Sequence, residues 1–295
     1  MTLREFGGIS YTMQEKLYGA PVRLNIPSGK LAPFAGGTIG YLFEPETKEE
    51  LYGAVRALNS KGKKYHIAGA LTNTLISSGG IENLVSTKKI NYIYFRGNML
   101  IAGAGASLGK IARAALENGL SGLEPLSGIP GTVGGAAAMN AGAFGAEIGD
   151  YVTEIEVLSG DSVIRTLPTF SYRKADFLGE AIGEVVLSLN FSEVSSAELI
   201  QKYRSERLKK QPQERSLGSV WKSVKGVPAA VYIEKLNLKG TRAGGAELST
   251  KHCNFIVNKG GATTADFLKL AATVEQAAKE KLGIELEREI KILAD

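Results

Sequence analysis

The sequence predicts an α+β protein of two domains, and three features lead to this expectation. The chain has 295 residues, which is enough for two domains with cores of their own. Its first part, to about residue 190, mixes short strand-like runs with two capped helices. After a helix that ends at Gln211-Pro212, further strands and a long amphipathic helix follow. We therefore expect a first domain over residues 1–193, with its core at about 34–192, and a second, smaller one over 194–295.

Two helices of the first half carry clear start signals. Thr47-Lys-Glu-Glu50 is a capping box, and apolar residues follow it at helical spacing through Leu58. Ser107 is placed to cap the second helix, with Gly119 as its C-terminal stop. Residues 152–157 alternate as a half-buried strand that turns into 163–167 as a hairpin. The other predicted strands of this half are 64–67 and 185–191.

The second half begins with Ser195-Ser-Ala-Glu198, which opens a helix running toward Lys210. Residues 255–257 predict a strand, and 264–282 predict an amphipathic helix closed by Gly283. Residues 284–293 predict a last strand. The apolar side chains of this strand point mostly to one face, at Ile284, Leu286, Ile290 and Ile292.

Composition narrows the function classes. Apolar residues make up 44% and charged residues 22% of the chain, as in ordinary globular proteins. No apolar run approaches the ~20 residues of a membrane span, and the first residues lack the apolar core of a signal peptide. A single cysteine, Cys253, and two histidines fit a reducing compartment and argue against a zinc site. We expect a cytoplasmic protein with no membrane partner and no metal.

A formal charge of +5 and a pI near 9.1 favour anionic partners. The basic residues are spread along the chain, and their densest cluster, at 202–210, is interrupted by Glu206 and is typical of a helix face. We therefore expect phosphorylated small molecules rather than nucleic acid as ligands.

The most informative stretch is the glycine- and alanine-rich run at residues 127–145. It has almost no side-chain bulk, so it can present backbone N–H groups to a flat, phosphate-bearing ligand. A tightly packed turn that binds nothing is the alternative. Gly134-Gly135-Ala136 lacks the Lys-Ser/Thr ending of a P-loop, and the run that starts at Gly103 lacks the Rossmann spacing.

This run and five further motifs, in order along the chain, resemble the UDP-N-acetylenolpyruvoylglucosamine reductase family. A first glycine turn, Phe34-Ala-Gly-Gly37, precedes the run. A tyrosine-arginine motif (170–177), a serine motif (Gly218-Ser-Val-Trp-Lys222), a long signature (244–258) and a terminal glutamate motif (Glu287-Arg-Glu-Ile-Lys291) follow it. The absence of a tyrosine-bearing lid insertion in the C-terminal half is typical of the shorter, second type in the family.

This resemblance implies a fold and a reaction. The fold is a p-cresol-methylhydroxylase-type FAD-binding domain followed by an α+β substrate domain. The reaction is reduction of the enolpyruvyl ether of UDP-N-acetylglucosamine-enolpyruvate to UDP-N-acetylmuramate, for peptidoglycan synthesis. FAD would be held non-covalently and NADPH would be the co-substrate. We expect a monomer that acts on these small molecules.

The resemblance also implies roles for residues. Arg173 would stabilise the enolate, Ser219 would donate the proton, and Glu289 would be its acid partner. Spacing alone does not select Glu289 over Glu285 and Glu287, since all three fall on one face of the predicted strand. The positions expected to bind the cofactor are Gly69, Thr72, Asn73, Gly128, Ile129, Pro130, Gly131, Thr132, Met139, Asn140 and Gly142.

Several positions depart from the family pattern. In the loop from Gly69 to Asn73 the usual second glycine is Leu71 or Ala70, which puts a Cβ where backbone should approach phosphate. The other departures are Ala175, Trp221 and Ser223-Val224. A catalytically impaired paralogue and a different FAD-linked oxidoreductase of the same fold, with His66 near a covalently bound flavin, are the alternatives.

Overall fold

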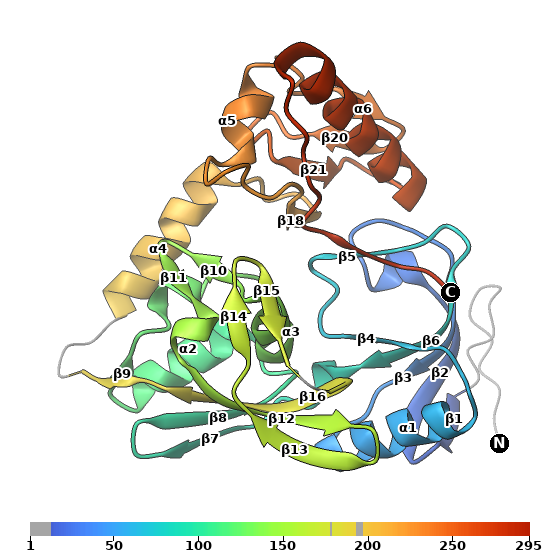
Figure 1. Ribbon diagram of the computed structural model, residues 1–295, viewed down its shortest axis with the longest axis vertical. Coiled ribbons are helices and arrows are strands. Elements are labelled where there is room, and N and C mark those ends of the chain that lie inside the picture. Colours follow the sequence, from blue (N-terminus) through green and yellow to red (C-terminus); the bar gives the residue numbers. More distant parts are fainter. Residues whose placement is uncertain (1–12, 178, 193–196) are drawn as a thin grey trace.

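The computed structural model describes residues 13–177, 179–192 and 197–295. Two five-stranded sheets lie side by side in the lower part of Figure 1, and a four-stranded sheet with two helices lies above them. The helix α4 (Ala197–Lys210) runs along one edge, from the second sheet toward the upper part. This mixture of helices and strands confirms the α+β expectation.

The first sheet has the strand order β1-β2-β3-β6-β4. Helix α1 packs on it and starts where the capping box predicts: Thr47 Oγ1 accepts the Glu50 N–H at 3.1 Å. The Glu50 carboxylate accepts the N–H of Glu46 rather than that of Thr47. The elements are β1 (Met13–Leu17), β2 (Ala20–Pro27), β3 (Thr38–Phe43), α1 (Lys48–Ser60), β4 (His66–Ala68), β5 (Thr74–Ile76) and β6 (Ile81–Ser86).

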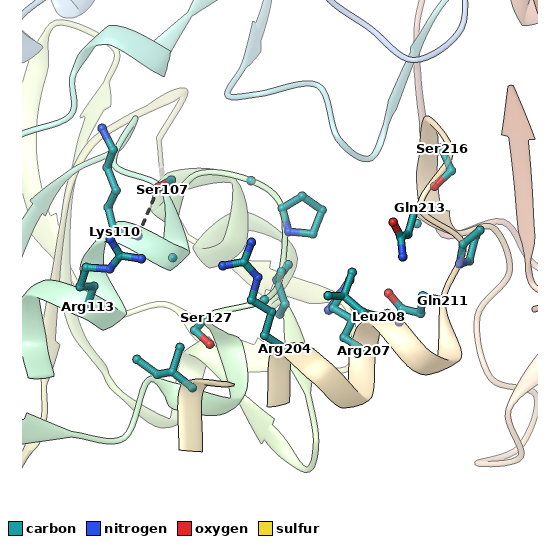
Figure 2. A pocket seen from close by; sticks show the side chains of 18 of the residues that line it. Ser107, Lys110, Arg113, Ser127, Arg204, Arg207, Leu208, Gln211, Gln213 and Ser216 are labelled. Atoms are coloured by element: carbon teal, nitrogen blue, oxygen red, sulfur yellow. Dashed lines mark hydrogen bonds between the residues drawn. The ribbon is translucent and has the colours of Figure 1, made fainter. Parts of the chain in front are cut away.

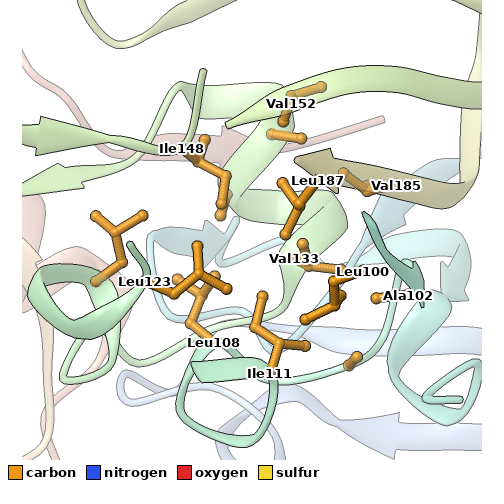
Figure 3. Packing of buried hydrophobic residues seen from close by; sticks show 14 of the residues in the cluster. Leu100, Ala102, Leu108, Ile111, Leu123, Val133, Ile148, Val152, Val185 and Leu187 are labelled. Carbon is orange, nitrogen blue, oxygen red and sulfur yellow. The ribbon is translucent and has the colours of Figure 1, made fainter. Parts of the chain in front are cut away.

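The second sheet is antiparallel, with the order β13-β12-β16-β8-β7. One face packs on α2 and α3, where Leu108, Ile111 and Val133 meet strand residues such as Val185 (Figure 3). Ser107 caps α2 as predicted. The elements are β7 (Ile93–Arg96), β8 (Met99–Gly103), α2 (Leu108–Glu117), α3 (Val133–Met139), β12 (Val152–Ser159), β13 (Ser162–Thr166) and β16 (Ala181–Ser188).

The predicted half-buried alternation of 152–157 is wrong, although the hairpin with 162–166 is confirmed. Glu156 is buried because helix α1 covers the other face of the sheet there. Lys48 of α1 lies 2.9 Å from its carboxylate, and Tyr52 donates to it. Both faces of β12 are therefore shielded from water around Glu156, whereas Thr153 stays exposed.

The remaining short strands of the first half form two-stranded pairs: β10 with β11, β14 with β15, and β17 with β9. They are β9 (Leu120–Ser121), β10 (Gly142–Ala143), β11 (Ala146–Glu147), β14 (Thr169–Ser171), β15 (Lys174–Asp176) and β17 (Asn190–Phe191), with the 3-10 turns Ser28–Lys30, Thr87–Lys89, Glu124–Leu126 and Ile148–Asp150.

The upper part is a four-stranded antiparallel sheet, β18-β21-β20-β19, packed on α6. The predicted long helix is confirmed, and Gly283 closes it with a φ of 65°. The elements are β18 (Ser216–Ser219), α5 (Ala229–Glu234), β19 (Arg242–Ala243), β20 (Ala246–Leu248), β21 (Phe255–Asn258), α6 (Thr264–Leu282) and β22 (Lys291–Leu293).

The predicted last strand over 284–293 is mostly wrong, since only β22 is a strand. It pairs in parallel with β5 of the first half, so the chain end returns to the N-terminal part. Residues 284–290 form no strand. Among them, Arg288 makes an isolated β-bridge to Trp221. Ile292 is consequently 43% exposed, against the predicted one-sided pattern.

The proposed boundary at 193/194 and the Ser195 cap lie outside the described residues. Apolar packing also crosses between the halves: Phe34 meets Phe267 with ring centroids 4.8 Å apart, and Leu75 joins the same cluster. The division into two domains therefore stays a proposal.

Candidate active site

Arg173 and Glu289 form an ion pair at the meeting point of the halves. Tyr172 and Arg173 make the two-residue turn between β14 and β15, and Arg173 has a left-handed φ of 56°. Such a conformation is uncommon for a residue with a Cβ and occurs in turns and at functional sites. Arg173 Nε donates to Glu289 Oε1 at 2.8 Å, and Arg173 Nη1 lies 3.7 Å from Glu147 Oε1.

The residues that follow Ser219 join the segment of this pair through the backbone. Gly218 has a φ of 78°, which only glycine adopts easily, but it lies within β18 (Ser216–Ser219) at an irregularity of the β18–β21 pairing, so the expected tight turn is wrong. The next two residues, Val220 and Trp221, are buried. The Glu289 N–H donates to Val220 O, and the Lys222 N–H donates to Glu287 O, each at 2.8 Å. These two bonds set Glu289 opposite the residue that follows Ser219.

Burial separates Glu289 from its two neighbours. Its side chain is 15% exposed, whereas those of Glu285 and Glu287 are 81% and 74% exposed. Burial raises the pKa of Glu289, although Arg173 and Lys222 act in the opposite direction. A carboxyl group with a raised pKa can hold a proton more readily at neutral pH, which suits an acid partner.

The two loops expected to hold a cofactor touch each other. Thr72 Oγ1 donates to Pro130 O at 3.0 Å. A Cβ on Gly69 would lie 2.2 Å from Thr132 Oγ1, so this approach requires glycine. Across the described residues, no acceptor is bonded to the backbone N–H groups from Ala70 to Asn73. The loops therefore present free donors that fit the phosphates of FAD.

Asn73 joins these loops to the ion pair. Its Nδ2 lies 3.3 Å from Glu289 O and 3.8 Å from Met139 Sδ. Asn140 is 2% exposed, and its side chain donates to Ser171 O and Glu147, which supports the Tyr172-Arg173 turn from below. The candidate residues 69–73, 128–132, 139, 173 and 289 are thus brought together. Gly142 instead backs onto Ala146 and Glu147 in the β10–β11 hairpin.

Leu71 takes the strained position of the altered loop. Its φ is 55°, where the family glycine would be unstrained. Its side chain is 6% exposed and packs in a cluster with Ile76 and Leu84. The Leu71 side chain therefore points into the core of the first half rather than toward a phosphate.

A cavity of about 910 Å³ flanks the other side of the loop at residues 128–131. Basic side chains from α2 and α4 line it, and Arg204 lies close to the loop in Figure 2. A Cβ on Gly128 would lie 3.2 Å from Arg207 Cδ, so Arg207 rests directly on the glycine loop. The charged residues around the cavity are Lys110, Arg113, Arg204, Arg207 and Arg215, with Glu117 and Glu214.

Two residues of the site were missed in the sequence, Glu147 and Tyr172. The Tyr172 ring lies 4.9 Å from the Arg173 guanidinium, and its hydroxyl lies 3.2 Å from Ser223 Oγ. Tyr172 stands in the tyrosine-arginine motif and could have been selected there, because a cation beside a ring is a common pairing. Glu147 had no such signal, since its contact depends on the β10–β11 hairpin.

Residues 13–177, 179–192 and 197–295 hold no group of three or more His, Cys, Asp or Glu side chains that could bind a metal ion. Among the described helices, none combines the length and the apolar character needed to cross a bilayer.

Comparison with known proteins identifies the family. Residues 211–293 match the family "UDP-N-acetylenolpyruvoylglucosamine reductase, C-terminal domain", and residues 39–167 match the family "FAD binding domain". The reductase of that name from Caldanaerobacter subterraneus subsp. tengcongensis is 38% identical over 294 residues, covering 96% of this chain and 97% of its own.

Two further relatives carry the same name. That of Geobacillus kaustophilus is 36% identical over 269 residues, covering 88% of both chains. The crystal structure of the enzyme from Thermus caldophilus superposes with a TM-score of 0.77 at 29% identity, over 97% of this chain and 100% of its own. The chain therefore belongs to the UDP-N-acetylenolpyruvoylglucosamine reductase family.

Proposed function

We propose that this protein reduces the enolpyruvyl ether of UDP-N-acetylglucosamine-enolpyruvate to UDP-N-acetylmuramate, with NADPH as the reductant. The observation that carries the proposal is the Arg173–Glu289 ion pair, joined through the backbone to the residues that follow Ser219 and set against the glycine loops. An isolated salt bridge needs neither the left-handed Arg173 nor the free loop donors. Both are expected at a site that stabilises a developing anion.

FAD, when bound, supplies hydride transfer. The residues that would hold it are in the two touching loops, with Thr72, Asn73 and the glycine run at 128–131 toward its phosphates and ring. The fit rests on the loop donors and on the close approach of Gly69 to Thr132. The site-residue assignment is part of the proposal.

The chain's own residues handle charge and proton. Addition of hydride to the vinyl carbon leaves the electron pair on the carbon next to the carboxylate, as an enolate-like dianion. This charge needs cationic stabilisation in a site shielded from water. Arg173 supplies that cation through its planar fork. Ser219 gives its proton to the carbon next to the carboxylate, and the resulting alkoxide needs a nearby proton source. Glu289, which pairs with Arg173 and whose pKa is raised by burial, provides one.

The basic cavity beside Gly128 suits the phosphate-bearing part of these ligands. UDP-sugar, NADPH and FAD are all anions, and the cavity is large enough for a nucleotide. Burial lowers the pKa of Arg207, because desolvation disfavours its charged form, and a bound phosphate would compensate for this. We place a nucleotide phosphate against Arg204 and Arg207.

An anaerobic two-step experiment tests the function. The purified protein is reconstituted with FAD, bleached with NADPH, and then mixed with the enolpyruvyl UDP-sugar. Recovery of the flavin absorbance together with formation of UDP-N-acetylmuramate is the expected result. No recovery, in a sample that carries flavin, rejects the reductase function. Acid precipitation should release the yellow colour, and colour retained in the pellet would show covalent attachment.

A further inference from the structure

A second carboxylate, outside the ion pair, lies on the far side of the same backbone segments. Glu275 of α6 accepts Nε of Arg288 at 2.6 Å and Nη2 of Arg288 at 2.7 Å, one at each oxygen. The oxygen that accepts Nε also accepts the indole N–H of Trp221 at 2.8 Å. One side chain therefore holds a residue of the serine motif and a residue of the glutamate motif at once.

The two anchored residues are direct neighbours of the active groups. Trp221 stands two positions after Ser219, and Arg288 stands one position before Glu289. Trp221 and Arg288 also face each other in an isolated antiparallel bridge. In extended chain, successive side chains point to opposite sides. Arg288 accordingly reaches back to α6, while Glu289 reaches forward to Arg173.

The serine segment has its own support at the same point. Asn254 accepts the Trp221 N–H and donates to the Trp221 carbonyl, both at 2.9 Å. Trp221 is 1% exposed, so its position is rigidly packed. The glutamate segment has no regular sheet around it over 284–290. Besides the ion pairs of its glutamates and the buried Ile290, it is held by the two backbone bonds at Glu287 and Glu289 and by the Arg288 side chain.

We propose that Glu275 is a positioning residue for the reduction, because it locks the register between the Ser219–Lys222 segment and the Glu287–Glu289 segment. A slip of one residue would send Glu289 toward α6 and Arg288 toward the substrate. The two-point contact with Arg288 resists that slip, because two parallel N–H···O bonds fix the orientation of the guanidinium relative to the carboxylate. This proposal rests on the proposed function.

The test compares three single variants in the anaerobic half-reactions. Glu275→Gln loses the second acceptor and the charge, and Arg288→Gln loses the fork. The control is Glu285→Gln, which breaks the exposed ion pair between Lys279 of α6 and the same C-terminal segment, 3.0 Å long. Like Glu275→Gln, this variant removes one negative charge and breaks a contact between α6 and the C-terminal segment, but it leaves the contact between Glu275 and Arg288 intact.

We expect both Glu275→Gln and Arg288→Gln to slow reoxidation by the enolpyruvyl substrate by about 10- to 100-fold, the scale of a small misplacement of reacting groups. Bleaching by NADPH and the KM for the enolpyruvyl substrate should stay within about twofold, and Glu285→Gln should match the wild type throughout. A kcat loss without a KM change, and with bleaching intact, is not expected from a general loss of folding.

Two results overturn the proposal. One is an unchanged rate of reoxidation in both Glu275→Gln and Arg288→Gln. The other is an equal loss in both half-reactions, which would make Glu275 a purely structural residue. Should Glu275→Gln fail to fold, Arg288→Gln decides alone, because its side chain is 29% exposed and leaves a smaller defect. Absence of reoxidation in the wild type rejects the proposed function instead, so the two failures are distinct.

Discussion

Nε of Arg173 lies 2.8 Å from Oε1 of Glu289, across 116 positions of the chain. One partner stands in the turn of the two-stranded β14–β15 hairpin, and the other follows the last helix. Their contact joins a permanent cation to a carboxyl group whose pKa is raised by burial. A negative charge that develops between them would meet both a fixed positive charge and a source of protons.

Arg173→Lys should not behave as a conservative change. Lysine keeps the charge but loses the planar two-point grip on a carboxylate. We expect a loss of about 2–4 kcal/mol in transition-state stabilisation, similar to the loss of one oxyanion donor. The ratio of single-turnover reoxidation rates measures it. Near wild-type turnover would assign Arg173 to a structural bridge.

Ser219→Ala should separate the two half-reactions. No proton from Ser219 is needed while NADPH bleaches the flavin, so that step should be unchanged. Reoxidation by substrate should slow by about 10²-fold or more, as for a positioned acid. An equal loss in both steps would point to a displaced flavin.

Glu289→Gln should impair reoxidation more than Glu285→Gln or Glu287→Gln. Glutamine keeps the shape but cannot exchange a proton, and Glu289 is the buried one of the three. The two exposed positions should change the free energy of unfolding by less than about 0.5 kcal/mol. If Glu287→Gln is the slow variant, the acid must be reassigned to Glu287.

The raised pKa of Glu289 predicts a pH dependence of stability. A carboxyl group with a higher pKa in the folded state adds stability below its unfolded pKa, and this stability is lost as the pH rises through the folded pKa. Glutamine mimics the protonated form at every pH. The Tm of Glu289→Gln, measured relative to wild type from acid to neutral pH, should therefore rise.

Glu285→Gln is the control for the removal of one charge. A relative Tm of Glu289→Gln that falls toward neutral pH would mean that Arg173 outweighs burial, and the raised pKa would then be wrong.

Leu71→Gly should destabilise the protein without tightening FAD binding. The glycine would relieve the left-handed strain at φ 55°, worth about 1–2 kcal/mol. Loss of a buried leucine costs about 2–5 kcal/mol, so the net change should be unfavourable. Thermal unfolding and FAD titration of the apoprotein measure both effects. A gain in FAD affinity would show that the Cβ of Leu71 keeps the phosphate away from the loop backbone.

Local signals in the sequence were sufficient for elements whose ends are capped by their own residues. Thr47, Ser107 and Gly283 begin or end their helices as predicted, because a cap involves groups only a few positions apart. The glycine run was found for a similar reason, since the absence of side chains is a property of the residues themselves. The serine motif was selected only by its resemblance to the family.

Only the tertiary structure decided what lies opposite these elements. The alternation in 152–157 failed because helix α1 covers the outer face of the sheet, and the last strand shrank to Lys291–Leu293 because its partner is β5, far away in the chain. In the same way Glu289 was indistinguishable from Glu285 and Glu287 by spacing. Burial against Arg173, and the anchoring of Arg288 by Glu275, depend on contacts between segments that period and propensity do not encode.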